Sequence, residues 1–150
     1  MWPFRDAKPS DLPVVLELLQ TNSLPYQDIT ARHLANFLVV DNGETIAGFV
    51  GLERYGNDAL LRSLAVKEQS RYSGLGTKLV RTIEARAAQS GVSALYLLTT
   101  TANEFFLHRG YKPIARSEVP AALLQSPEFS SLCPLEAVCL RKSLLSEHRD

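Results

Sequence analysis

The sequence predicts an α/β protein in which helices cover one mixed, mostly antiparallel β-sheet. Strand-like apolar segments alternate with segments whose apolar residues recur every three or four positions, in the order β-α-α-β-β-β-α-β-α-β-β. The chain has 150 residues, 45% hydrophobic and 21% charged, without an internal repeat or a Gly/Ser-rich linker. We therefore expect a single domain over residues 1–150, with about seven strands and about four helices.

The first half of the chain predicts a strand, two helices and a three-stranded meander. Residues 3–8 are expected to form the strand, and a helix with apolar residues at helical spacing follows Asp11. Asp28 is expected to cap a short second helix that carries Leu34. Residues 37–66 then contain three strands, separated by turn residues at 41–43 and 55–58.

The second half begins with a glycine-containing loop and an amphipathic helix. Its apolar stripe consists of Leu75, Leu79, Ile83 and Ala87, and Gly91 ends it. Residues 94–100 have too little alternation for a wet face, which predicts a central strand. A helix starting near Thr101 and stopped by Gly110, a strand at 111–115, a loop-rich segment at 116–134 and a strand at 136–144 complete the pattern.

Composition excludes several classes of function. Sixteen basic and sixteen acidic residues cancel, so the broad positive field needed for non-specific nucleic-acid binding is missing. The N-terminus lacks the apolar segment of a secretory signal, and no apolar run is long enough to span a bilayer. Two cysteines, Cys133 and Cys139, indicate core thiols in a reducing cytoplasm.

The segment RYSGLG, residues 71–76, places two glycines between a strand and a helix. A dinucleotide fingerprint fails because Leu79 stands at the third glycine, and the Gly-Lys-Ser/Thr of a phosphate loop is absent. Two interpretations remain: a tight turn that needs glycine for steric reasons, or a turn whose backbone amides face an anion.

Four sequence blocks resemble the GCN5-related N-acetyltransferase (GNAT) family. They are L-x-x-LAV at 61–66, R-x-x-G-x-G at 71–76, LLTTTA at 97–102 and F-x-x-R-G-Y at 106–111. The chain is most similar to the acetyltransferase domains of N-acetylglutamate synthases and to small arsenic-resistance-associated N-acetyltransferases, which share a segment like 128–134. The resemblance implies a GNAT fold, with the sheet splayed between its fourth and fifth strands.

The resemblance also implies acetyl-CoA as co-substrate. No metal is expected, because His33, His108 and His148 show no metal-ligand spacing. A backbone amide of Leu64 or Val66 would polarise the thioester carbonyl. The positions implied to bind acetyl-CoA are Leu64, Ala65, Val66, Arg71, Tyr72, Ser73, Gly74, Leu75, Gly76, Thr77, Thr99 and Phe106.

The chain departs from the family pattern at two catalytic positions. Leu60 replaces the glutamate that often serves as general base, and Glu53 is the nearest candidate to act instead, through a water. The alternative for Glu53 is a solvated acid at a strand end. Phe106 replaces the tyrosine that protonates the CoA sulfur, so water is expected to supply that proton.

Arg62 interrupts an apolar strand, and an unpaired buried guanidinium is costly. One hypothesis is that Arg62 binds a carboxylate of an amino-acid-like acceptor, with Thr99, Thr100 and Phe129 nearby. The alternative is an ion pair with Glu53 or Asp58 on a neighbouring strand.

The sequence thus predicts an acetyl-CoA-dependent N-acetyltransferase that acetylates a small, amino-acid-like amine. A catalytically idle CoA-binding module and a protein-lysine acetyltransferase remain alternatives, and a link to arsenic resistance comes from the resemblance alone. The last strand and residues 116–134 offer surfaces for a homodimer.

Overall fold

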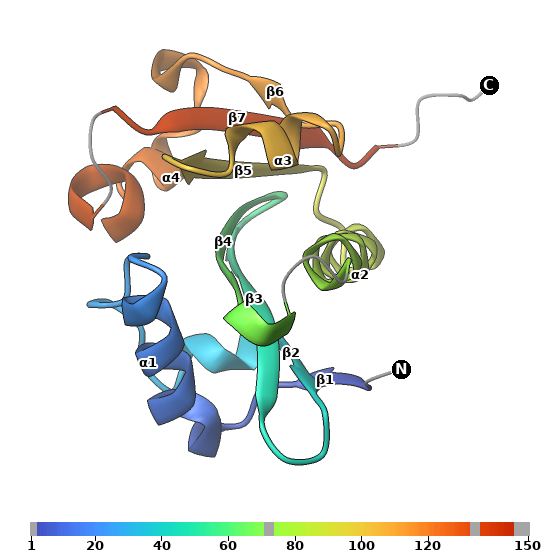
Figure 1. Cartoon of the computed structure of the whole chain (residues 1–150). Helices are drawn as coiled ribbons and strands as arrows, with labels where there is room; N and C mark the ends of the chain where they lie inside the picture. Colours follow the sequence, from blue (N-terminus) through green and yellow to red (C-terminus); the bar gives the residue numbers. More distant parts are fainter. Residues whose placement is uncertain (1–2, 71–73, 133–135, 146–150) are drawn as a thin grey trace. The chain divides into compact units, whose positions relative to one another are not determined.

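The structure is a computed structural model and describes residues 3–70, 74–132 and 136–145. Its centre is a seven-stranded sheet with the strand order β1-β2-β3-β4-β5-β7-β6 (Figure 1). The pair β4–β5 is parallel, and the pairs β1–β2, β2–β3, β5–β7 and β6–β7 are antiparallel. The strands are β1 (Phe4–Asp6), β2 (Phe37–Asp41), β3 (Ile46–Tyr55), β4 (Asp58–Val66), β5 (Ala94–Thr99), β6 (Lys112–Pro113) and β7 (Val138–Ser143). The predicted mixed sheet is confirmed.

The helices are α1 (Leu12–Thr21), α2 (Leu75–Gln89), α3 (Asn103–Leu107) and α4 (Ala121–Leu124). Short 3₁₀ turns lie at Pro9–Asp11, His33–Asn36, Glu68–Ser70 and Arg116–Glu118, and a π turn at Glu128–Leu132. The stripe predicted on α2 is buried, and Gly91 follows the helix with a φ of 97°, a conformation that glycine adopts without steric cost. None of the helices in the described part of the chain has the length and hydropathy needed to cross a bilayer.

The chain divides into two compact units. Unit 1 comprises Met1–Glu53 and Leu61–Arg86, and unit 2 comprises Arg54–Leu60 and Ala87–Asp150. Strands β3 and β4 therefore contribute residues to both units.

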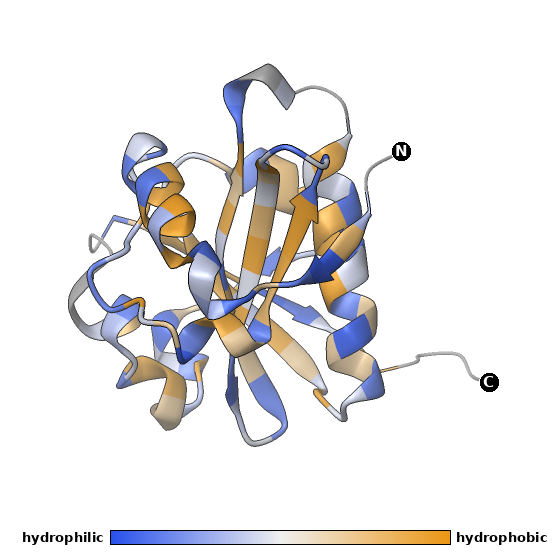
Figure 2. Cartoon of the chain, turned by 90° about the horizontal axis from the view of Figure 1, so that it is seen from below, coloured by the Kyte–Doolittle hydropathy of each residue, from blue (hydrophilic) through white to orange (hydrophobic). Residues whose placement is uncertain are grey.

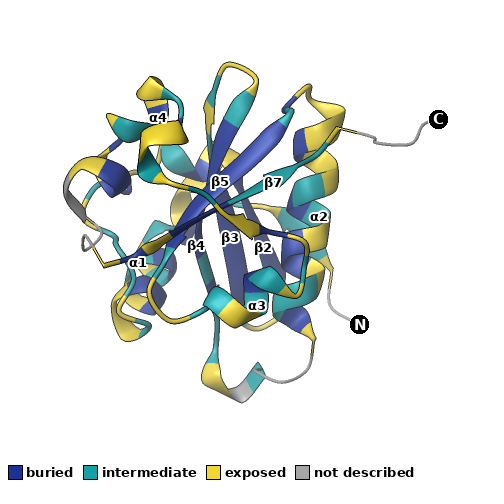
Figure 3. Cartoon of the chain, turned by 90° about the horizontal axis from the view of Figure 1, so that it is seen from above, coloured by how far each residue is buried: buried dark blue, intermediate teal, exposed yellow. Residues whose placement is uncertain are grey.

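The core of unit 1 lies where α1 packs on the N-terminal strands. Hydrophobic residues concentrate on the strands, and β2 as far as Val40 and the first six residues of β3 are buried (Figures 2 and 3). Phe37 pairs with Gly51 across β2 and β3, and a Cβ atom on Gly51 would lie 2.3 Å from Cε1 of Phe37. Glycine at position 51 is therefore required, because only its bare Cα leaves room for the phenyl ring.

The core of unit 2 surrounds β5, which is buried along nearly all its length. Its hydrogen-bonded partners are Asp58–Leu60 of β4 on one side and β7 on the other, as expected for the predicted central strand. Phe106 and Tyr111 pack edge to face, with ring centroids 5.3 Å apart.

Several predicted elements differ in the structure. Asp28 caps no helix, because its carboxylate binds Arg62 instead, and only a 3₁₀ turn carries Leu34. The helix before Gly110 is shorter than predicted. Its N-cap residue is Ala102, so no side chain caps it. The strand predicted at 111–115 is reduced to two residues. The segment predicted as a long loop contains helical turns, of which α4 buries Leu123.

Candidate active site

The glycine turn of unit 1 leads directly into α2. Gly74 has a φ of 83°, in the left-handed region that favours glycine, and its carbonyl accepts the first helical hydrogen bond from the Lys78 amide at 3.1 Å. Gly76 and Thr77 follow within the first turn, after Leu75, which is buried. The first backbone N–H groups of an α-helix have no intrahelical acceptor and lie at the positive end of its dipole, which suits a phosphate group.

The other members of the predicted glycine-loop site, Arg71, Tyr72 and Ser73, lie outside the described residues. Strand β4 precedes the loop, and Leu64, Ala65 and Val66 form its last residues. A Cβ atom on Gly48 would lie 2.9 Å from the Ala65 carbonyl oxygen, so β3 and β4 approach closely at this point.

The pairing of strand β4 with β5 ends at Leu60. Its ladder with β5 pairs Asp58, Ala59 and Leu60 only, all within unit 2. In unit 1, Ser63 adopts a φ of 64°, which costs a non-glycine residue roughly 1–2 kcal/mol. Left-handed residues within a strand concentrate where a backbone group is redirected for function. The residues that follow are those that the resemblance assigns to the thioester.

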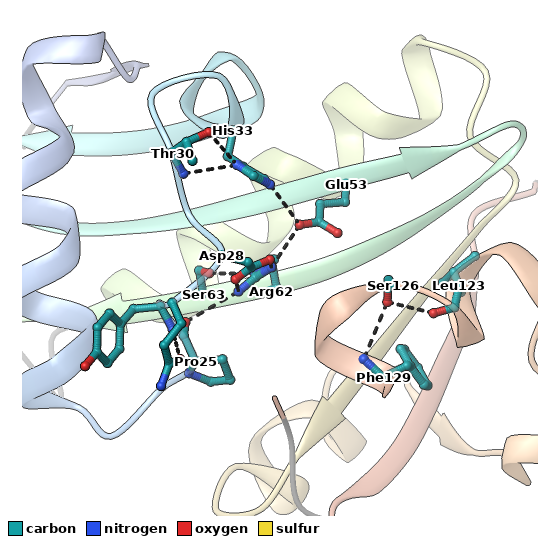
Figure 4. A network of polar contacts seen from close by, with 12 residues as sticks. Pro25, Asp28, Thr30, His33, Glu53, Arg62, Ser63, Leu123, Ser126 and Phe129 are labelled. Atoms are coloured by element: carbon teal, nitrogen blue, oxygen red, sulfur yellow. Dashed lines mark hydrogen bonds and ion pairs between the residues drawn. The ribbon is translucent and has the colours of Figure 1, made fainter. Parts of the chain in front are cut away.

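Arg62 lies at the centre of a polar network (Figure 4), and its side chain is fully buried. Its Nη1 donates to Oδ2 of Asp28 at 2.6 Å and to Oε2 of Glu53 at 2.8 Å. Its Nη2 donates to Oδ1 of Asp28 at 2.9 Å and to the Pro25 carbonyl at 3.4 Å. Its Nε donates to Oγ of Ser63 at 3.1 Å. All five guanidinium N–H groups thus have acceptors within the chain.

The network continues from Glu53 to His33, which belongs to the 3₁₀ turn at His33–Asn36. Nε2 of His33 lies 3.6 Å from Oε2 of Glu53, and the two side chains are 28% and 12% exposed. The backbone amide of Thr30 donates to Nδ1 of His33 at 3.1 Å. Glu53 is therefore held between a guanidinium and an imidazole, in place of the solvated acid that the sequence offered as the alternative.

The ligand atoms of Asp28, His33 and Glu53 all lie within 4.8 Å of one another, so they have the spacing of a metal site. The Arg62 guanidinium already bonds to both carboxylates and supplies a positive charge between them. A divalent cation would have to displace these hydrogen bonds, which makes this set a poor fit for a metal while Arg62 is in place.

The remaining predicted residues belong to unit 2. Oγ1 of Thr99 accepts a hydrogen bond from the Ala102 amide at 2.9 Å, and Thr100 is exposed. Phe106 and Phe129 are only 5% and 6% exposed, and both pack in the hydrophobic interior of this unit. Phe129 is therefore a core residue in place of the predicted contact with an acceptor.

The prediction for Arg62 is revised in the same way. Its side chain offers no N–H to a substrate carboxylate without first giving up a partner in the chain. Of the two partners that the sequence suggested as the alternative, Glu53 is confirmed, and Asp28 takes the place expected for Asp58. Asp28 and His33 were missed because they follow the first helix, at sequence positions far from Arg62. The isolated arginine in an apolar strand indicated that acidic partners must exist, but not which residues they are.

Burial raises the pKa of the Cys139 thiol to about 11, so the reactive thiolate is scarce at neutral pH. Cys139 is a core thiol, as predicted. Cys133 lies outside the described residues.

Residues 33–113, more than half of the chain, match the acetyltransferase (GNAT) domain. The chain therefore belongs to the GNAT acetyltransferase family, whose class of reaction is acetyl-CoA-dependent N-acetyl transfer.

Among the relatives of known sequence is an amino-acid acetyltransferase of Pseudomonas putida, 33% identical over 98 residues. This match covers 64% of the present chain and 23% of the relative, so the chain spans about a quarter of the length of that enzyme. An uncharacterized N-acetyltransferase of Chlorobaculum tepidum is 32% identical over 109 residues, which cover 72% of this chain and 68% of the relative.

Two solved structures show the same fold. N-acetylglutamate synthase from Neisseria gonorrhoeae, complexed with coenzyme A and N-acetyl-glutamate, aligns with a TM-score of 0.85 at 21% identity, over 97% of this chain and 36% of that one. Rv2747 from Mycobacterium tuberculosis, in complex with CoA and NLQ, aligns with a TM-score of 0.80 at 20% identity, over 95% of this chain and 99% of that one.

Proposed function

We propose that this protein transfers the acetyl group of acetyl-CoA to the amine of a small, amino-acid-like acceptor. The observation that carries the proposal is the glycine turn before α2: Gly74, in a left-handed conformation, immediately precedes this 15-residue helix, and β4 and the 3₁₀ turn at Glu68–Ser70 come before it in the chain. In a member of the GNAT family, this arrangement suits the diphosphate of CoA, because a side chain is missing where the phosphates approach the main chain.

The residues proposed to hold acetyl-CoA are grouped in unit 1. Backbone amides at the start of α2 would bind the diphosphate, and the main chain of Leu64–Val66 would pair with the pantetheine arm and donate to the thioester carbonyl. Thr99 and Phe106, which belong to unit 2, stay predictions from the resemblance. The complexes of two structural neighbours with CoA support this assignment.

The chemistry requires a neutral amine. An acceptor ammonium gives one proton to a base, and its nitrogen then attacks the carbonyl carbon, so that a C–N bond forms and the C–S bond breaks. The second proton lost from nitrogen neutralises the departing thiolate. We assign the base to Glu53, directly or through a water. Asp28 and Glu53 carry two negative charges against the one of Arg62, so the cluster attracts an ammonium group.

An amino-acid-like acceptor is supported by the names of relatives such as the Pseudomonas amino-acid acetyltransferase and by the N-acetyl-glutamate bound to one structural neighbour. Because Arg62 is already engaged, we place it as a residue that positions Glu53, and the group that would bind an acceptor carboxylate is not assigned.

Calorimetry with acetyl-CoA, followed by thiol release against a panel of amino acids and their amides, tests the proposal. We expect binding and acceptor-dependent thiol release. Glu53→Gln should lower kcat by about 10²–10⁴-fold, the usual contribution of a general base, whereas Glu44→Gln, in an exposed turn, should not. Binding without turnover on any amine would favour an idle CoA-binding module instead.

A further inference from the structure

Glu53 does not stand alone in its network, and a backbone contact of the neighbouring His33 selects one tautomer of its ring. A backbone amide can only donate a hydrogen bond, and the Thr30 amide points at Nδ1 of His33 at 3.1 Å. Nδ1 must therefore present its lone pair. In the neutral imidazole the single hydrogen is then carried by Nε2.

That Nε2–H group faces the Glu53 carboxylate. The distance of 3.6 Å from Nε2 to Oε2 is longer than a hydrogen bond. Because apo-state contacts of catalytic groups are often long and tighten with substrate bound, this distance is compatible with a working pair. The imidazole is 28% exposed and the carboxylate only 12%, so His33 forms the more accessible end of the network.

Arg62 fixes the same carboxylate oxygen. The same Oε2 atom accepts a hydrogen bond from Nη1 at 2.8 Å, and Asp28 holds the guanidinium in turn through two bonds of 2.6 and 2.9 Å. Oε2 of Glu53 thus faces both the guanidinium of Arg62, which Asp28 holds in place, and the imidazole of His33.

We infer that His33 is a positioning residue for acetyl transfer: Thr30 fixes its tautomer, and its Nε2–H orients the Glu53 carboxylate toward the acceptor amine. This inference rests on the proposed function, in which Glu53 is the base. His33 itself does not carry the transferred proton, because the lone pair on Nδ1 is used by the Thr30 amide and Nε2 already bears hydrogen.

Two variants separate this role from others. In His33→Gln, the side-chain amide can donate from nearly the position of Nε2 but cannot titrate, whereas His33→Ala removes the donor. We expect His33→Ala to lower kcat by about 10- to 100-fold, a part of what a general base supplies, with KM for acetyl-CoA unchanged. His33→Gln should recover most of that loss. His108→Gln, at an exposed histidine of unit 2, is the matched control and should behave as wild type.

A spectroscopic measurement supplements the kinetics. In protein labelled with ¹⁵N-histidine, long-range ¹H–¹⁵N correlations should show the Nε2–H tautomer for His33, identified by the signals that disappear in His33→Gln, and Glu53→Gln should shift those signals.

The outcomes are distinct. Wild-type protein that transfers no acetyl group overturns the proposed function and this inference together. If wild type is active, a His33→Gln variant as impaired as His33→Ala overturns the inference alone, because it would make His33 a titrating base. Full activity in His33→Ala, or an Nδ1–H tautomer, overturns it as well.

Discussion

Asn in place of Asp28 should destabilise the fold by about 2–3 kcal/mol. The Asp28 carboxylate makes a two-pronged contact with a guanidinium whose side chain is fully buried, at 2.6 and 2.9 Å. Breaking one partner of a buried ion pair typically costs about 3–5 kcal/mol. Asp28 is 14% exposed, and asparagine keeps one acceptor oxygen, so water and the remaining bond offset part of that cost.

The expected change is measurable by thermal and urea unfolding. For a chain of this size, roughly 2–4 °C of Tm corresponds to 1 kcal/mol, so Asp28→Asn should lower Tm by roughly 4–12 °C. Asp6→Asn is the control, because Asp6 pairs with Arg86 and both side chains are substantially exposed, at 73% and 45%. Exposed pairs contribute little, and this variant should unfold close to wild type.

The reasoning fails if the two asparagine variants unfold at the same temperature. Such a result would mean that the Arg62 guanidinium finds solvent or another acceptor at little cost, and that the network does not anchor the segment between α1 and β2. A large Tm loss together with wild-type kcat would preserve the energetic estimate but remove the link between Asp28 and the orientation of Glu53.

Three further predictions concern other parts of the chain. Gly74→Ala and Gly43→Ala both force alanine into a left-handed conformation without a steric clash, and each should destabilise the fold by roughly 1 kcal/mol. Only Gly74→Ala should also raise KM for acetyl-CoA. Equal kinetic effects of the two variants would contradict a role of the glycine turn in binding acetyl-CoA. The Arg5 hydrogen bond keeps the pKa of Asp11 below its ordinary value of 3.8, so this ion pair stabilises the fold above that pH and stops doing so as the pH falls through the lower, folded-state pKa. Asp11→Asn should therefore weaken the acid dependence of the free energy of unfolding. An unchanged acid dependence would contradict this. Cys139, with its pKa raised to about 11, should resist iodoacetamide at pH 8 in the folded protein and react on unfolding, which peptide mass spectrometry measures. Modification at the same rate in both states would show that the thiol is accessible in the folded protein.

Local patterns in the sequence were sufficient for most of the fold. The stripe from Leu75 to Ala87 predicted α2, because a 3.6-residue period places those side chains on one face. Apolar runs and turn residues located the strands of the meander, since Gly43 and Gly56 adopt the positive φ values that such turns need. Predictions were weakest where the local signal was shortest: the helix expected after Asp28 and the strand after Gly110 are reduced to single turns or two residues.

The sequence by itself determined the family, through four motifs whose residues lie close together along the chain. It also showed that Arg62 needed a partner, because a guanidinium inside an apolar strand cannot remain unpaired. Only the tertiary structure decided which partners it has. Asp28 lies 34 positions before Arg62, and the chain after α1 brings both Asp28 and His33 to β3 and β4. A periodic pattern in the sequence cannot predict such a contact between distant segments. The backbone motifs of the candidate site can thus be predicted from short stretches of sequence. Its side-chain contacts form only when distant segments pack together, so the sequence alone does not show them.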